Sequence, residues 1–286
     1  MGEGDRKTPE FCQNQLRDLN HDRYLACLYL PENLRNLAMT LYAFDTEISK
    51  ISSAISEPMT GEIRIQWWRD TVQAGTSNTH NPLADELLSE MTAHKLPLLP
   101  LDTYLQARIF DLYNDPMPDI GTLEGYCGET ASVFIQLLTM AAKLEQDRAM
   151  ADICGHAGMV LALTDIIRFL PRHNAQNKIY IPKEMLEAAG LSLEDWFSEK
   201  KSKKHMEMLN GIFDLADNHL MALKNIQKEY NASKKDISLI LLPTSLCKLY
   251  LRSSRKLNDH IFTRIPTISP LKKLWTLWRA ARTGNI

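Results

Sequence analysis

Apolar residues recur at steps of three and four along most of this chain, and this spacing restricts it to a helical architecture. Leu34, Leu37, Leu41 and Phe44 follow one another in this pattern. Such spacing places them on one face of an α-helix, which we expect to reach about residue 53. The only β-like stretch, 178–181, is short and precedes a proline, so it is expected to be an extended connector.

The remaining segments also read as helices separated by prolines and polar loops. Further helices are expected at about 63–72, 83–94, 98–113, 121–143, 147–170, 202–229, 234–256 and 270–282. The sequence shows no internal repeat, low-complexity tract or long linker. One all-α domain, a single-domain helical bundle covering 1–286, is therefore the economical prediction.

Composition excludes several classes of protein. Hydrophobic residues make up 44% and charged residues 24%, with a net charge of −2, which is typical of a globular protein and not of a nucleic-acid binder. Five scattered cysteines without a Cys-x-x-Cys pair argue against a disulfide or zinc framework. No apolar run approaches the ~20 residues of a membrane span, and the N-terminus resembles neither a secretory signal nor a transit peptide. The expected location is a cytoplasm, or a mitochondrial matrix in a eukaryote, with contact to the inner membrane left open.

Three segments carry polar residues within apolar helices. They are LYAFDTEIS at 41–49, GEIRIQWWRD at 61–70, and LALTDIIR at 161–168, the last followed by KIYIP at 178–182. In this order and spacing the set resembles the squalene/phytoene synthases. The segment EGYC at 124–127 is similar to another part of that family, and the resemblance runs from about Arg23 to about Leu251.

The resemblance implies the isoprenoid synthase fold, an all-α bundle with a central cavity. Members of the family join two prenyl diphosphates head to head, using two Asp-x-x-x-Asp motifs on facing helices. Aspartates four residues apart share one helix face, and Mg²⁺ bridges such carboxylates to phosphate. The metal also stabilises the diphosphate leaving group.

This chain departs from the family at both acidic motifs. The first window runs from Ser49 to Ser53 and the second from Phe169 to His173, and neither contains a carboxylate. Neutral imidazole is a poor ligand for Mg²⁺, so His173 does not replace an aspartate. We therefore expect no cofactor, with Mg²⁺ required only if the chain is an active transferase.

Other family positions are retained or only partly changed. Arg168 occupies the place of a diphosphate-contacting arginine, Lys178 matches a basic residue before Tyr-x-Pro, and Asp165 stands where the family has asparagine. Tyr42 and Tyr126 match tyrosines of the family's cavity. The resemblance implies that these five residues form the remnant of a diphosphate and cavity site.

A narrower resemblance concerns one degenerate branch of the family. The segments Gln66–Trp68 and Pro171–His173 resemble that branch, which includes mitochondrial complex I assembly factor 6 and alphaproteobacterial relatives. The branch implies a pseudoenzyme acting in respiratory complex I assembly, with complex I subunits as partners. An isoprenoid or lipid carrier, and a prenyl transferase of isoprenoid biosynthesis that recruits carboxylates such as Asp45, Asp111, Asp115 and Asp165, remain open.

Several side chains have a structural interpretation beside the functional one. Asp165 and Arg168, one turn apart, form either a local ion pair or a polar ligand site. Adjacent Trp67 and Trp68 point about 100° apart, so one is expected in the core and one at the rim. The last helix carries an apolar stripe with basic flanks, which either closes the bundle or meets a membrane surface or partner.

Overall fold

The computed structural model describes residues 3–55, 57–198, 200–230 and 234–285. These residues form helices and turns and no strand. In chain order the elements are α1 (Glu3–Leu19), α2 (His21–Cys27), α3 (Glu32–Ile51), α4 (Pro58–Ala74), α5 (Pro82–Ala93), α6 (Leu99–Ala107), η1 (Arg108–Leu112), α7 (Ile120–Cys127), η2 (Gly128–Ser132), α8 (Val133–Ala141), α9 (Arg148–Arg168), α10 (Leu170–Ala175), α11 (Lys183–Ala188), α12 (Leu193–Phe197), α13 (Lys203–Glu229), α14 (Lys234–Ile240), η3 (Leu242–Leu246), α15 (Cys247–Lys256), η4 (Asn258–Phe262) and α16 (Pro270–Thr283).

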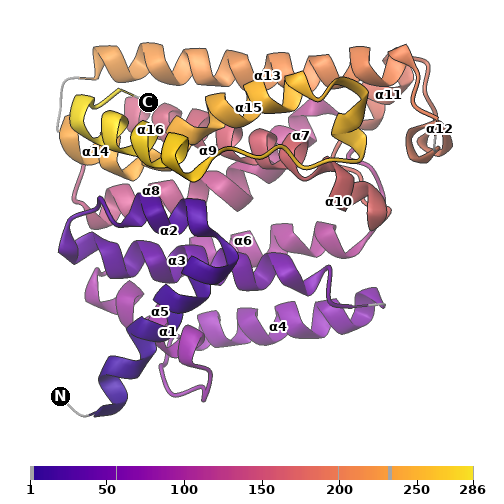
Figure 1. Ribbon diagram of the computed structural model, residues 1–286. Helices are drawn as coiled ribbons and strands as arrows, with labels where there is room; N and C mark the ends of the chain where they lie inside the picture. Colours follow the sequence, from indigo (N-terminus) through magenta and orange to yellow (C-terminus); the bar gives the residue numbers. More distant parts are fainter. Residues whose placement is uncertain (1–2, 56, 199, 231–233, 286) are drawn as a thin grey trace.

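The helices lie in stacked layers around α9 (Figure 1). α9 packs against α13, α15, α8 and η2, and α3 packs against α1, α5 and α8. By length and composition α9 could cross a membrane, but most of it is buried inside the bundle, as expected for a core helix. Its apolar character therefore follows from its central position.

The predicted α3 illustrates how the apolar spacing determines the layers. Leu34, Leu37, Leu41 and Phe44 are all buried, as the spacing predicts. Pro31 is the residue directly before α3. The first N–H groups of a helix have no partner within the helix, so the N–H that proline lacks is not missed there. Burying such a stripe stabilises the fold by roughly 1.5–3 kcal/mol for each large side chain.

The structure confirms the all-α prediction but divides some of the predicted helices. The segment 121–143 contains a π-helical turn, η2, between α7 and α8, and the segment 234–256 is interrupted by η3, which contains Pro243. The short helices α10, α11 and α12, and the first helices α1 and α2, were not predicted. Residues 178–181 form the expected connector and no strand.

The tight approach of α9 to η2 depends on a glycine. A Cβ atom on Gly158 would lie 2.0 Å from Ser132 Oγ and 2.5 Å from its backbone nitrogen. Only glycine allows the two backbones to come this close. This contact brings the π turn, and Tyr126 before it, beside the helix that carries Asp165 and Arg168.

Candidate functional site

A cavity of about 720 Å³ lies between the two main groups of buried apolar side chains. All five residues expected from the family resemblance line it, namely Tyr42 from α3, Tyr126 from α7, Asp165 and Arg168 from α9, and Lys178 from the connector before α11. Segments far apart in the sequence thus contribute to one polar site.

The four positions of the degenerate acidic motifs line the same cavity. Ser49 lies in the last turn of α3 and Ser53 in the turn that follows it, while Phe169 directly precedes α10 and His173 lies within it. Burial lowers the pKa of His173 to about 4, so its imidazole is neutral at physiological pH. Hydroxyl groups, an aromatic ring and a neutral imidazole therefore stand where the family has carboxylates.

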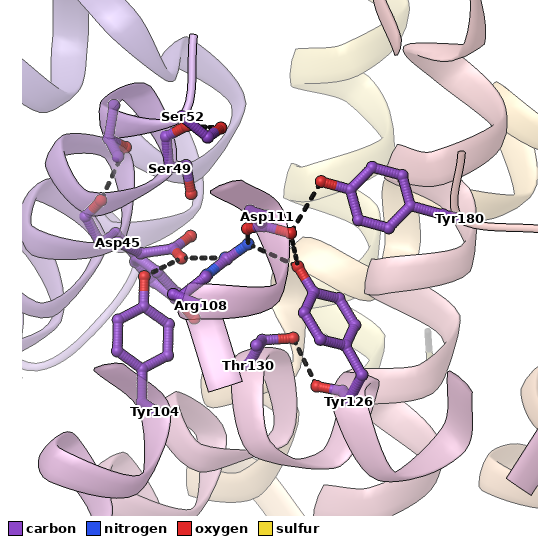
Figure 2. A network of polar contacts seen from close by, with 11 residues as sticks. Asp45, Ser49, Ser52, Tyr104, Arg108, Asp111, Tyr126, Thr130 and Tyr180 are labelled. Carbon is purple, nitrogen blue, oxygen red and sulfur yellow. Dashed lines mark hydrogen bonds and ion pairs between the residues drawn. The ribbon is translucent and has the colours of Figure 1, made fainter. Parts of the chain in front are cut away.

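Arg108 joins two of the cavity carboxylates (Figure 2). Its Nη2 lies 2.7 Å from Asp45 Oδ1, and its Nη1 lies 3.0 Å from Asp111 Oδ2. The hydroxyl of Tyr104 donates a further hydrogen bond of 2.8 Å to Asp45. Arg108 and Asp111 are three residues apart in η1, a spacing that places both side chains on one face.

Asp111 is nearly completely buried and accepts hydrogen bonds from two tyrosines as well. The hydroxyls of Tyr126 and Tyr180 donate to Asp111 Oδ1 at 2.7 and 2.8 Å (Figure 2). Burial, together with the charge of Asp111, raises the pKa of both tyrosines well above the usual value, so they stay protonated donors. Lys178 Nζ donates a hydrogen bond of 2.7 Å to the backbone carbonyl of Asp111. This bond links η1 to the connector that precedes α11.

A second cluster forms around Asp22 of α2. Lys273 of α16 donates to Asp22 Oδ1 at 2.7 Å, and the Tyr250 hydroxyl and Arg168 Nη1 donate to Oδ2, the latter at 3.2 Å. Burial opposes ionisation of Asp22, but the hydrogen bonds from Lys273 and Tyr250 and the charge of Arg168 outweigh it and lower its pKa. Asp22 is therefore a stable carboxylate that ties α2 to α9, α15 and α16.

Of the two alternatives for Asp165 and Arg168, the local ion pair is wrong, because Arg168 pairs with Asp22 instead. The Arg168 guanidinium also lies 3.9 Å from the centre of the Tyr250 ring. Among the described residues, none donates a hydrogen bond to Asp165. Burial raises the pKa of Asp165, although the charges of Arg23 and Arg168 partly offset this effect.

Other polar atoms around Asp165 also lack partners. Arg23 lies over the Tyr42 ring at 4.9 Å, and its buried Nη1 has no hydrogen-bond partner in the described part of the chain. The same holds for Arg168 Nε. Buried polar groups are rarely left unsatisfied, so this part of the cavity is suited to a polar ligand group or water.

The cavity side chains do not fit the Mg²⁺ cage that the fold family implies. Asp22, Asp45 and Asp111 already accept hydrogen bonds from cationic side chains. Within the described ranges, no three His, Cys, Asp or Glu residues are placed to hold a metal ion. Asp115, one of the carboxylates considered for recruitment, is exposed and does not line the cavity.

Five charged or aromatic residues of the cavity were not predicted as site residues from the sequence. They are Asp22, Arg23, Arg108, Tyr250 and Lys273. Asn20 caps α2 and so begins the helix that presents Asp22 and Arg23, a signal visible in the sequence. No local signal distinguishes Lys273 from the other lysine and arginines of α16, which are all exposed.

Side chains of α3 and α4 outside the cavity are also accounted for. Glu47 accepts a hydrogen bond of 2.9 Å from Gln15 of α1. The expectation for the adjacent indoles is confirmed, since Trp68 is buried and Trp67 is exposed.

Comparisons with known proteins identify the family and the fold. The family model for squalene/phytoene synthase matches residues 16–277. The chain belongs to the squalene/phytoene synthase family. A dehydrosqualene synthase in complex with ligand superposes with a TM-score of 0.79 at 14% identity, covering 97% of this chain and 96% of that one, which confirms the isoprenoid synthase fold.

Two kinds of relative within the family are similar in sequence. "NADH dehydrogenase (ubiquinone) complex I, assembly factor 6" from Bos taurus is 25% identical over 284 residues, covering 97% of this chain and 84% of that protein. A presqualene diphosphate synthase from Sinorhizobium fredii is 26% identical over 174 residues, covering 60% of this chain and 62% of that protein. The similarity to the assembly factors therefore extends over more of the chain than the similarity to the synthase.

Proposed function

We propose that this squalene/phytoene synthase family member is non-catalytic and acts in the assembly of respiratory complex I, with its cavity holding an isoprenoid or other lipid. The observation that carries the proposal is the state of the cavity carboxylates. Asp22, Asp45 and Asp111 are bound by cationic and phenolic groups of the chain itself. Freeing Asp22 for Mg²⁺ would take the carboxylate partner from both Arg168 and Lys273, and freeing Asp45 or Asp111 would leave Arg108 with one carboxylate instead of two. Breaking a buried ion pair in this way costs about 3–5 kcal/mol.

The comparisons support the cellular part of this proposal. The similarity to complex I assembly factor 6 covers nearly the whole chain. We accordingly place the protein where complex I is assembled, in a mitochondrial matrix or bacterial cytoplasm beside the inner membrane, with complex I subunits as partners. The cavity supports the proposed lipid ligand. Its lining combines apolar side chains such as Phe134 and Leu161 with two nitrogens, Arg23 Nη1 and Arg168 Nε, that have no hydrogen-bond partner among the described residues.

Turnover of labelled farnesyl and geranylgeranyl diphosphate, with Mg²⁺ and with or without NADPH, tests the non-catalytic part. We expect no diphosphate release above a heat-killed control while circular dichroism shows a folded helical protein. Calorimetric titration with farnesyl diphosphate adds a second readout. Any binding should be the same in Mg²⁺ and in EDTA, because no carboxylate pair is free to recruit the metal. Release above the control would overturn the proposal.

Deletion of the gene in its native cell tests the assembly part. We expect less fully assembled complex I on native gels, restored by the wild-type gene. Arg168→Met should fail to restore it, because the variant loses the contact to Asp22 and the cation beside Asp165. Arg264→Met is the matched control, since Arg264 is exposed and away from the cavity. Normal complex I after deletion would rule this part out.

The alternative is a prenyl transferase with a rebuilt site. Its support is the similarity to presqualene diphosphate synthase and the position of Arg168 and Lys178 in the cavity. It requires Mg²⁺ and a carboxylate such as Asp165, the one cavity acid without a hydrogen-bond donor among the described residues. Diphosphate release that survives both Asp165→Ala and Arg168→Ala would refute this assignment of the site.

A further inference from the structure

The C-terminal helix α16 exposes an apolar stripe on the outside of the bundle. Leu271 is 80% and Trp275 61% exposed, and Leu274 and Trp278 are each 42% exposed. The opposite side of the helix is the one that closes the bundle, through the buried Leu277. The bundle therefore leaves most of Leu271 and Trp275, and a substantial part of Leu274 and Trp278, open to water. Exposed apolar patches of this kind mark interaction sites.

The two indoles form a pair flanked by arginine. The rings of Trp275 and Trp278 lie 5.0 Å apart, and the Arg282 guanidinium lies 5.5 Å from the Trp278 ring. Lys272 and Arg279 are exposed on the same helix, which contains no Asp or Glu. Tryptophan with neighbouring lysine and arginine is the composition that favours the boundary between lipid headgroups and acyl chains.

The neighbouring helix α15 presents its cations to another side. Tyr250 of α15 and Leu277 of α16 belong to one apolar cluster, so α15 lies beside α16 (Figure 1). The exposed Lys248 and Arg252 are two residues from Tyr250 in either direction, so they point away from α16 and toward Lys224 of α13. The positive charge beside the stripe therefore comes from the exposed basic residues of α16 itself.

We propose that α16 and its basic flanks bind the surface of a membrane that contains anionic phospholipids. The indoles and leucines insert between headgroups, and Lys272, Arg279 and Arg282 contact phosphate. Charge complementarity selects a membrane over an apolar protein surface, because several uncompensated cations border the stripe while the nearest groove includes only Asp236 as an acid. α16 also carries Lys273, which reaches Asp22 in the cavity, so the bound membrane adjoins the candidate site.

Flotation of the full chain with vesicles tests this proposal. We expect binding to vesicles of phosphatidylcholine mixed with phosphatidylglycerol, a blue shift of the indole emission, and weak binding to phosphatidylcholine alone. Trp275→Ser with Trp278→Ser should abolish the interaction. Lys272→Gln with Arg279→Gln should weaken it by at least about tenfold, since each cation near an anionic surface contributes a factor of about five. High salt should weaken it as well.

Trp67→Ser is the matched control, because Trp67 is an exposed indole on α4, which lies on another side of the bundle (Figure 1). It should bind vesicles like the wild type. Equal binding to neutral and anionic vesicles, or no binding to either, would overturn the proposal. Self-association that the Trp275/Trp278 substitutions abolish, without vesicle binding, would instead assign the stripe to a second copy of the chain. The vesicle assay needs no cavity ligand, so its failure would leave the proposed function intact.

Discussion

Replacement of Asp111 by alanine should be the most destabilising change in the cavity wall. Asp111 is 5% exposed and accepts side-chain hydrogen bonds from Arg108, Tyr126 and Tyr180 at 3.0, 2.7 and 2.8 Å. The substitution leaves two phenolic donors without this acceptor and Arg108 with one carboxylate instead of two. Breaking a buried ion pair costs about 3–5 kcal/mol, so we expect about 4 kcal/mol.

Thermal unfolding measures this loss. At about 2.1 cal/mol/K per residue, the 286 residues give an unfolding entropy of about 0.6 kcal/mol/K. A loss of about 4 kcal/mol then lowers Tm by about 7 °C. Asp115→Ala is the control, because Asp115 is exposed and should change the stability by less than about 0.5 kcal/mol. If the Tm of Asp111→Ala matched that of the control, the network would not hold the cavity together as argued.

Three further substitutions should give measurable changes in Tm. Asp22→Asn should lower Tm at pH 7. Because the pKa of Asp22 is lower in the folded than in the unfolded state, the difference in Tm should begin to shrink near pH 4 and vanish only below the folded-state pKa. Asp165→Asn should raise Tm at pH 7, because burial raises the pKa of Asp165 and the charged carboxylate therefore destabilises the fold. This gain in Tm should vanish below about pH 4, where the carboxyl is protonated in both the folded and the unfolded state. A lower Tm of the variant at pH 7 would contradict the reasoning. Gly158→Ala should lose about 1–3 kcal/mol by collision with Ser132, whereas Gly155→Ala, with open space around it, should be neutral or stabilising.

The sequence predicts the helical layers well because their signal is local. Spacing such as Leu34, Leu37 and Leu41 on α3 decides which face is buried, whatever the helix packs against. The breaks are harder to predict. The π turn η2 lies within an apolar segment that reads as one helix, and its position depends on the approach of Gly158 from a helix about thirty residues later.

Only the site residues that lie in motifs resembling the family could be predicted from the sequence. Tyr42, Asp165 and Arg168 lie on segments that resemble the family, and the structure brings them into one cavity. Their partners are not predictable from spacing, because Asp22 and Lys273 are 251 residues apart and meet only after the bundle closes. Arg168 pairs with Asp22 rather than Asp165 for the same reason: a partner from another helix offers better geometry than the residue one turn away.

The pairing of the carboxylates means that their charges are balanced by cationic side chains of the chain itself. Acidic motifs that face each other repel until Mg²⁺ joins them, so an apo enzyme of this type bears an electrostatic cost. Here Arg108 lies between Asp45 and Asp111, and Lys273 and Arg168 hold Asp22, so the chain supplies the positive charge itself. Asp165 is the exception, a half-buried carboxylate that lines the cavity and has no hydrogen-bond donor among the described residues. An unsatisfied group that destabilises a fold is typical of functional positions, because selection for stability alone would remove it. Asp165 and the adjacent Arg23 are therefore the residues at which a ligand of this cavity should first be sought.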